Sequence, residues 1–449
     1  MRALSFLLLV AVASPARAVE PTTLHIAVER YTLPNGLQVI LHEDHRLPNV
    51  VVDILFRVGS KDERAGRTGF AHLFEHLMFM GTRNVPNGGF DTIMEASGGS
   101  NNAETNEDFT NYFEAGPSNL LETFLWLEAD RLSSLPEDMT KAKVDLQRDV
   151  VKNERRQSYE NRPYGRVELE IPDKLYPPSH PYHHPVIGSH ADLNAASVED
   201  VKAFFRQYYV PSNASLVVSG DFATADAKKL VDKYFRWMPK AAQPPHAAPG
   251  PVRLAKSARV TLTDAVQLPR VVLAWHSPAI FANGDSEVEL LAALLGGGHS
   301  SRLYRSLVYQ RKLAEAVEVE QQSTRYGSQL VIVVTAMSGH SSAELEKAID
   351  EELAQLLGAA PATENEVEEA RAFTQTKMLR QLESPVRLAE AINFFEYWLG
   401  DASLLDKRLL ARFDGVRAAG LMTWAKNVLG EPHVTIVVEP KAETGGGAK

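Results

Sequence analysis

The chain has 449 residues and no cysteine, and its 57 acidic and 47 basic side chains give a formal net charge of −10. The lack of cysteine in the sequence excludes a disulfide scaffold, a thiolate-held iron–sulfur cluster, a cysteine-ligated zinc ion and a cysteine nucleophile. A metal site in this chain can therefore use only histidine and carboxylate ligands. The negative charge argues against nucleic acid or an anionic membrane surface as the partner.

The N-terminal residues have the pattern of a secretory signal peptide. Arg2 supplies a positive charge, residues 4–13 form an apolar run too short to span a bilayer, and residues 16–18 read Ala-Arg-Ala, a small-x-small cleavage site. We therefore expect residues 1–18 to be removed and the mature chain to be exported. The alternative, a retained membrane anchor, is disfavoured because Pro15 ends the apolar run early.

A β-hairpin is the next element along the chain. The dipeptide Asn35-Gly36 separates a strand ending at Thr32 from a strand over residues 37–43, and a third β-rich run follows at 50–58. Asn-Gly favours the tight turns that join antiparallel strands, because both residues tolerate a positive φ angle. The first part of the chain therefore predicts antiparallel sheet.

Residues 69–82 predict a helix that carries a metal site. Their apolar residues have helical spacing, so His72 and His76 lie one turn apart on the same face. Two imidazoles at that separation can converge on one tetrahedral zinc ion. Glu75 borders this face and can accept a proton from a water that the metal activates, in the pattern H-x-x-E-H. The alternative is a helix whose two histidines are one turn apart by chance.

Two histidines and a water leave zinc one protein ligand short. Because the chain has no cysteine, the third ligand is expected to be a carboxylate or another histidine. A helix predicted over residues 141–156 offers a candidate. Val150 and Val151 are expected to face the core, and Glu154 follows three to four residues beyond them. On its own, a glutamate at such a position is more often a solvated helix carboxylate than a metal ligand.

The H-x-x-E-H motif followed by Glu154, with about 77 residues between them, resembles the pitrilysin, insulysin and mitochondrial-processing-peptidase family of zinc metallopeptidases. The resemblance runs from roughly residue 31 to residue 440. It implies one zinc ion per chain, held by His72, His76 and Glu154, with Glu75 as general base. It also implies an endopeptidase that hydrolyses peptides or unfolded segments and, together with the predicted signal peptide, a periplasmic location.

Residues 98–112 resemble the segment with which this family enters its active-site edge strand. The resemblance implies that Asn102 and Ala103 bind substrate beside the scissile bond. An extended peptide that adds to a sheet edge is held by main-chain hydrogen bonds, so loose sequence specificity is expected. The alternative for this segment is a glycine-hinged loop between two strands, with no role in substrate binding.

Four histidines at positions 180, 183, 184 and 190 raise the question of a second metal site. Pro181 and Pro185 interrupt this segment, so a surface loop of irregular geometry is expected there. That geometry disfavours a second metal site.

Residues 239–256 contain five prolines and predict a linker between two halves of the chain. The order of elements is similar on both sides, which indicates a divergent internal duplication. We expect a zinc-binding catalytic domain over residues 26–238, a homologous second domain without a zinc motif over 257–440, and a flexible tail over 441–449. We call the parts before and after the linker the first half and the second half.

Capping boxes predict two helices of the second half. Ser341 pairs with Glu344 and Thr363 with Glu366, each just before an apolar periodic run, and Gly358 closes the first helix. Hairpins combined with long amphipathic helices predict an α+β fold. We expect two similar domains, each a largely antiparallel sheet covered by helices.

The second half departs from the family pattern at two positions. The resemblance implies an Arg and, seven residues later, a Tyr that bind substrate and stabilise the oxyanion, but Val308 and Glu315 occupy these places. Valine offers no donor, and a carboxylate would repel developing negative charge. In addition, Gln147 stands where the family usually has glutamate. We therefore hypothesise that this chain is the zinc-bearing subunit of a heterodimer whose paralogous partner supplies the Arg and Tyr.

Two other classes of protein stay open. A catalytically silent assembly subunit of the same fold would explain the missing Arg and Tyr but not the intact Glu75. A periplasmic metal-binding protein would explain the ligands but neither the general base nor the edge-strand segment.

Overall fold

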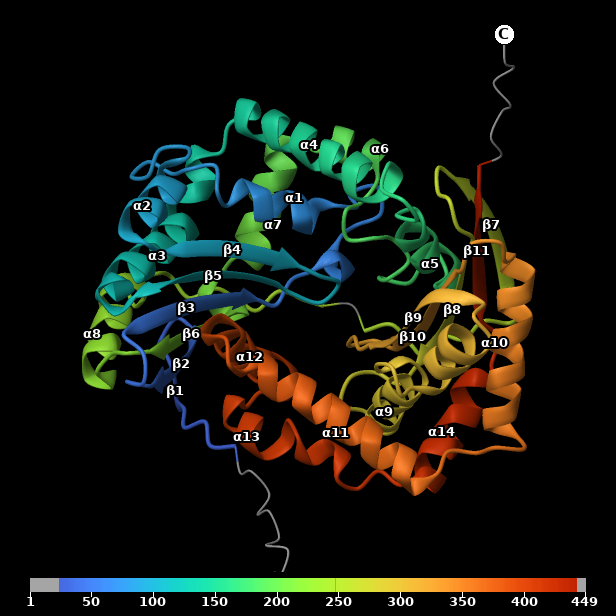
Figure 1. Ribbon diagram of the computed structural model, residues 1–449. Coiled ribbons are helices and arrows are strands. Elements are labelled where there is room, and N and C mark those ends of the chain that lie inside the picture. The colour runs from blue at the N-terminus through green and yellow to red at the C-terminus, as the bar shows by residue number, and fades with distance from the viewer. Residues whose placement is uncertain (1–23, 247, 442–449) are drawn as a thin grey trace, which may run out of the picture.

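The computed structural model describes residues 24–246 and 248–441, so the predicted signal peptide at 1–18 and nearly all of the predicted tail lie outside it. The chain forms two mixed sheets covered by helices, one in each half (Figure 1). The predicted α+β class is therefore confirmed. Residues 239–256 form neither helix nor strand where the structure describes them. No helix of the described part combines the length and apolar character needed to cross a membrane.

The first sheet has six strands in the order β1-β2-β6-β3-β5-β4, so β4 is an edge strand. All neighbours are antiparallel except β2 and β6. The predicted hairpin is confirmed as β1 and β2, with Gly36 at a φ of +95° in the turn. The strands are β1 (Glu29–Thr32), β2 (Gln38–Glu43), β3 (Asn49–Phe56), β4 (Ser100–Thr105), β5 (Thr110–Pro117) and β6 (Ala214–Gly220).

The second sheet has five strands in the order β7-β11-β8-β10-β9. It repeats the plan of the first, because β7 and β11 form its one parallel pair and the other neighbours are antiparallel. Both sheets are thus largely antiparallel, as predicted, with one parallel pair each. The strands are β7 (Ala258–Asp264), β8 (Arg270–Ser277), β9 (Ala314–Gln322), β10 (Ser328–Ala336) and β11 (Val434–Pro440).

Helices cover both sheets, and both capping boxes predicted for the second half are confirmed at the starts of α10 and α11. The helices of the first half are α1 (Phe70–Leu77), α2 (Gly89–Ser97), α3 (Leu121–Asp138), α4 (Lys141–Arg155), α5 (Val167–Leu175), α6 (His190–Ala195), α7 (Val198–Tyr208) and α8 (Thr224–Phe235). Those of the second half are α9 (Asp285–Gly296), α10 (Ser342–Leu357), α11 (Glu364–Gln381), α12 (Pro385–Leu399), α13 (Leu405–Arg408) and α14 (Ala418–Leu429). Two π-helical turns, η3 (Arg156–Glu160) and η5 (Tyr304–Gln310), and short 3₁₀ turns complete the described elements.

Each half covers part of the other half's sheet with one of its own helices. Helix α12 of the second half lies against the first sheet (Figure 1). Its Ile392 packs among Ile40 and Val217 of that sheet. Helix α5 of the first half packs Ile171 against Ile436 of the second sheet. Because both faces of these sheets are covered, their central strands are apolar in nearly every position rather than in alternate ones.

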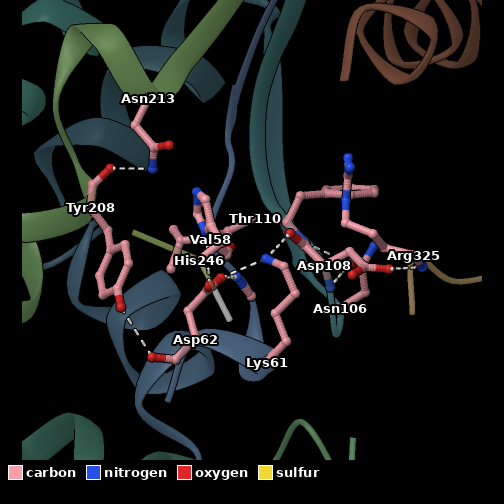
Figure 2. A network of polar contacts seen from close by, with 12 residues as sticks. Val58, Lys61, Asp62, Asn106, Asp108, Thr110, Tyr208, Asn213, His246 and Arg325 are labelled. Atoms are coloured by element: carbon pink, nitrogen blue, oxygen red, sulfur yellow. Dashed lines mark hydrogen bonds and ion pairs between the residues drawn. The ribbon is translucent and has the colours of Figure 1, made fainter. Parts of the chain in front are cut away.

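Asp108, in the turn between β4 and β5, ties the halves together (Figure 2). Its carboxylate accepts hydrogen bonds from the Tyr182 hydroxyl (2.6 Å) and from the backbone N–H of Arg325 (3.0 Å), which lies in the β9–β10 loop of the second half. Its backbone carbonyl accepts from Lys61 Nζ (2.8 Å) and from the Tyr397 hydroxyl of α12 (2.8 Å). The end of the edge strand β4 is therefore fixed by contacts from both halves.

Candidate metal centre

Helix α1 is held at its N-terminus by a buried carboxylate. It follows Gly69, whose φ of +87° lies in the left-handed region. The carboxylate of Glu63 accepts hydrogen bonds from the backbone N–H groups of Gly69 (2.9 Å) and Ala71 (2.7 Å), two of the donors that a helix start leaves unpaired. Phe74 and Leu77 bury the apolar face of the helix in the hydrophobic core of the first half. The histidines of the motif are left on the partly exposed opposite face.

The structure brings His72, His76 and Glu154 together as one group of possible metal ligands. The Nε2 atoms of the two histidines are 3.3 Å apart, and Glu154 Oε2 lies 3.7 Å from His72 Nε2 and 3.2 Å from His76 Nε2. Ligands on a tetrahedral zinc ion, with bonds of about 2.0–2.2 Å, are separated by roughly 3.3–3.6 Å. The three donor atoms therefore fit one zinc ion. No other group of this kind occurs among the described residues.

Helix α4 delivers Glu154 to this group from the opposite side. Val151 is fully buried, but Val150 is 40% exposed, so the prediction that both valines face the core is wrong. Consecutive residues of a helix point about 100° apart, and only one of two neighbours can lie at the centre of the buried stripe. Val151 and Glu154, three residues apart, share the side that faces α1.

The charges at the centre are coupled. Burial lowers the pKa of His72 to about 4, so this imidazole is neutral near pH 7 and offers a lone pair. Burial is the largest single influence on His76 and opposes its charged form, but the hydrogen bond to Glu154 and the negative charges of Glu75 and Glu154 together outweigh it and raise the pKa of His76. Burial raises the pKa of Glu75, against a hydrogen bond from the Thr105 side chain. The centre thus brings carboxylate and imidazole groups close together, and a divalent cation would bind to their lone pairs.

A cavity of about 320 Å³, which we call the metal-site cavity, opens at these residues. All its lining residues come from the first half: His72, Glu75, Glu104, Thr105, Asn106, Glu154, Tyr159, Val186 and Ile187. Asn102 and Ala103 do not line it, but they lie on the edge strand β4 that leads into it. The predicted edge position of these two residues is therefore present in the structure.

Comparisons with known proteins identify the family. The sequence pattern described as "Insulinase (Peptidase family M16)" matches residues 38–177, which contain the three ligands and Glu75. The pattern described as "Peptidase M16 inactive domain" matches residues 195–373. The chain belongs to the M16 peptidase family.

Individual M16 relatives agree with this assignment. "Zinc protease PqqE" of Helicobacter pylori is 34% identical over 291 residues, and the match spans 64% of this chain and 65% of that protein, just under two thirds of its length. "Uncharacterized zinc protease YmxG" of Bacillus subtilis is 21% identical over 415 residues, or 92% of this chain and 98% of that protein. Among solved structures, a protease from Helicobacter pylori superposes with a TM-score of 0.86 at 27% identity, covering 92% of this chain and all of that chain.

Sequence reasoning missed Thr105 and Tyr159 as residues of the metal-site cavity. Thr105 contacts the Glu75 carboxylate, and Tyr159 lines the metal-site cavity from the π-helical turn that directly follows α4. π-Helical turns are frequent at functional sites, because the extra residue redirects the side chains that follow. No local sequence signal marks such a turn. Gln147, the departure from the family glutamate, contacts His76 with its side chain.

The second half contributes no residue to the metal-site cavity. Val308 lies in η5 and packs against the core of the second half, and Glu315 lies exposed on β9. The structure therefore offers neither an Arg nor a Tyr from the second half at this cavity, within the residues that it describes.

The histidine-rich segment does not form a second metal group among the described residues. Its backbone is irregular, as predicted. His180, however, is only 4% exposed and stacks on Tyr176 at a ring distance of 4.6 Å, so the expected surface position is wrong for this residue. Aromatic stacking under the loop buries a residue that the flanking prolines alone would place outside.

Proposed function

We propose that this chain is a zinc-dependent endopeptidase that hydrolyses peptides or unfolded segments. The observation that carries the proposal is the group of His72, His76 and Glu154, with donor atoms 3.2–3.7 Å apart and Glu75 in the same cavity. Zinc, when bound by such ligands, polarises a carbonyl and lowers the pKa of a water ligand. The names of the M16 relatives as zinc proteases support the same metal.

Glu75 is the group that moves the proton. Its carboxylate lies in the metal-site cavity and is contacted by the Thr105 side chain, which restricts its orientation. From this place it can accept a proton from the attacking water and deliver it to the leaving amine. The free edge of β4 can hold an extended peptide by main-chain hydrogen bonds, with Asn102 and Ala103 beside the scissile bond.

We further propose that the chain acts as the zinc-bearing subunit of a heterodimer and is exported to the periplasm. The metal-site cavity has no lining residue from the second half, and Val308 and Glu315 replace the family Arg and Tyr. A paralogous partner could supply these two groups to stabilise the oxyanion. A silent subunit or a metal-binding protein is the weaker alternative, because neither has use for the half-buried carboxylate of Glu75.

Hydrolysis of a mixed peptide library by the purified, zinc-loaded protein tests the proposal. Glu75→Gln should keep zinc and lose activity by about a hundredfold or more, whereas the exposed control Glu95→Gln should keep both. The heterodimer predicts that the complex with such a partner chain is far more active than the chain alone. Equal rates would refute the need for a partner, and a zinc-loaded complex without any peptidase activity would refute the enzyme.

A further inference from the structure

A second cavity, of about 560 Å³, lies on the far side of β4 from helix α1. Its walls come from the first sheet and the β4–β5 turn, from residues 322–324 at the end of β9, and from helices α11 and α12 of the second half, and we call it the α12 cavity. It shares Glu104 and Asn106 with the metal-site cavity, so the two spaces meet at the end of β4. A peptide bound along β4 would therefore reach both cavities.

The walls of the α12 cavity are mostly apolar. Large side chains from both halves form them: Leu55, Phe109, Met378, Leu382, Phe394 and Trp398. Two polar atoms on the same walls, Nε1 of Trp398 and Oδ1 of Asn111, are buried without a hydrogen-bond partner among the described residues. Ligand sites of this size typically combine apolar walls with a few polar groups.

Most of the charged groups on these walls already have partners. Glu390 pairs with Arg387 at 2.8 Å, and the carboxylate of Asp53 accepts hydrogen bonds from the side-chain amides of Asn111 (3.2 Å) and Asn393 (2.5 Å). These carboxylates are thus engaged by the protein itself. Two further carboxylates on these walls, Glu104 and Glu107, make no ion pair among the described residues, so it is the large apolar side chains of the walls that argue for an apolar occupant.

Successive side chains of β4 point to opposite faces of the first sheet, and their burial alternates along the strand. Ala103 packs against the core of the first half and Thr105 contacts Glu75, both on the side of α1, whereas Glu104 between them is exposed and lines the α12 cavity as well as the rim of the metal-site cavity. A peptide strand paired with β4 alternates in the same way. Every second side chain of such a peptide would face away from α1 and toward the α12 cavity.

We propose that the α12 cavity is a specificity subsite that accepts one large apolar side chain of the bound peptide, of the size of leucine, methionine or phenylalanine. This inference rests on the proposed function, because it uses the peptide strand on β4. The second half then sets specificity through α11 and α12, although it contributes nothing to the metal-site cavity.

A substitution that fills the cavity tests the proposal. Ala391 lines the cavity from α12, so Ala391→Phe should occupy its space. In a position-scanned peptide library, the wild-type protein should prefer a large apolar side chain over alanine at one position by roughly tenfold or more in kcat/KM. Ala391→Phe should remove that preference, and the matched control Ala419→Phe, at an exposed position of α14, should keep it.

Binding of the same peptides to Glu75→Gln separates this inference from the peptidase proposal. If the wild-type protein cleaves peptides without such a preference, or prefers lysine or arginine there, the subsite is refuted and the peptidase stands. If no peptide is cleaved but Glu75→Gln binds the apolar peptide at least tenfold more tightly than the alanine peptide, and Ala391→Phe abolishes the difference, the subsite stands without the peptidase. Absence of any binding or cleavage refutes both.

Discussion

Asn393 of α12 is the polar centre of the contact between the halves, and its replacement by leucine should destabilise the whole chain. The side chain is fully buried, donates to Asp53 Oδ1 (2.5 Å), and accepts from Ser215 Oγ (2.5 Å). Asn393→Leu keeps the approximate volume but leaves both partners, themselves fully buried, without this bond. Each buried polar group left unpaired costs about 1–3 kcal/mol, so the expected loss is about 4 kcal/mol.

Urea denaturation followed by circular dichroism measures this loss as a change in the free energy of unfolding. The exposed control Asn427→Leu should stay within about 0.5 kcal/mol of the wild-type protein. Because α12 covers the first sheet, the two halves are expected to unfold in one transition. A loss below about 1 kcal/mol would show that the Asn393 bonds do not stabilise the contact between the halves, and two separate transitions in the wild-type protein would show that the halves unfold independently.

Two further predictions concern buried carboxylates. Burial raises the pKa of Asp53 to about 7, so near pH 6 the native state holds a proton that the unfolded state has lost. Between pH 5 and pH 8 the free energy of unfolding of the wild-type protein should therefore fall by on the order of 2–3 kcal/mol more than that of Asp53→Asn. The same pH dependence of the free energy of unfolding in both proteins would contradict this prediction. Glu63→Gln removes one of the two carboxylate oxygens that accept hydrogen bonds at the start of α1, and it should lower the free energy of unfolding by about 1–2 kcal/mol. It should also weaken zinc binding in a chelator competition, and unchanged affinity would mean that this cap does not position the ligands.

The features predicted from sequence are those whose cause is local. His72 and His76 share a helix face because they are four residues apart, and this geometry needs no knowledge of the rest of the chain. The hairpin at Gly36 and the capping box at Ser341 are similarly fixed by residues within one turn of each other. Glu154 could be predicted from the sequence only because the family resemblance indicates a glutamate ligand at that distance from the H-x-x-E-H helix.

The features that sequence reasoning missed depend on distant contacts. Asn393 bonds to Asp53, 340 residues earlier, and no pattern in α12 states which sheet the helix covers. The continuous apolar run of β3 indicates that both its faces are buried, but not by what. The contact of Thr105 with Glu75 likewise arises from packing of the edge strand against α1. Side-chain partners across elements follow from the assembled fold, not from local spacing.

The central claim is that His72, His76 and Glu154 hold one zinc ion. The most direct test is an X-ray absorption spectrum at the zinc edge of the protein loaded with one equivalent of zinc and then dialysed. We predict a four-coordinate ion with two imidazole nitrogens and a carboxylate oxygen at about 2.0–2.2 Å. Loss of zinc on dialysis, or a six-coordinate shell of oxygens without imidazole, would contradict it.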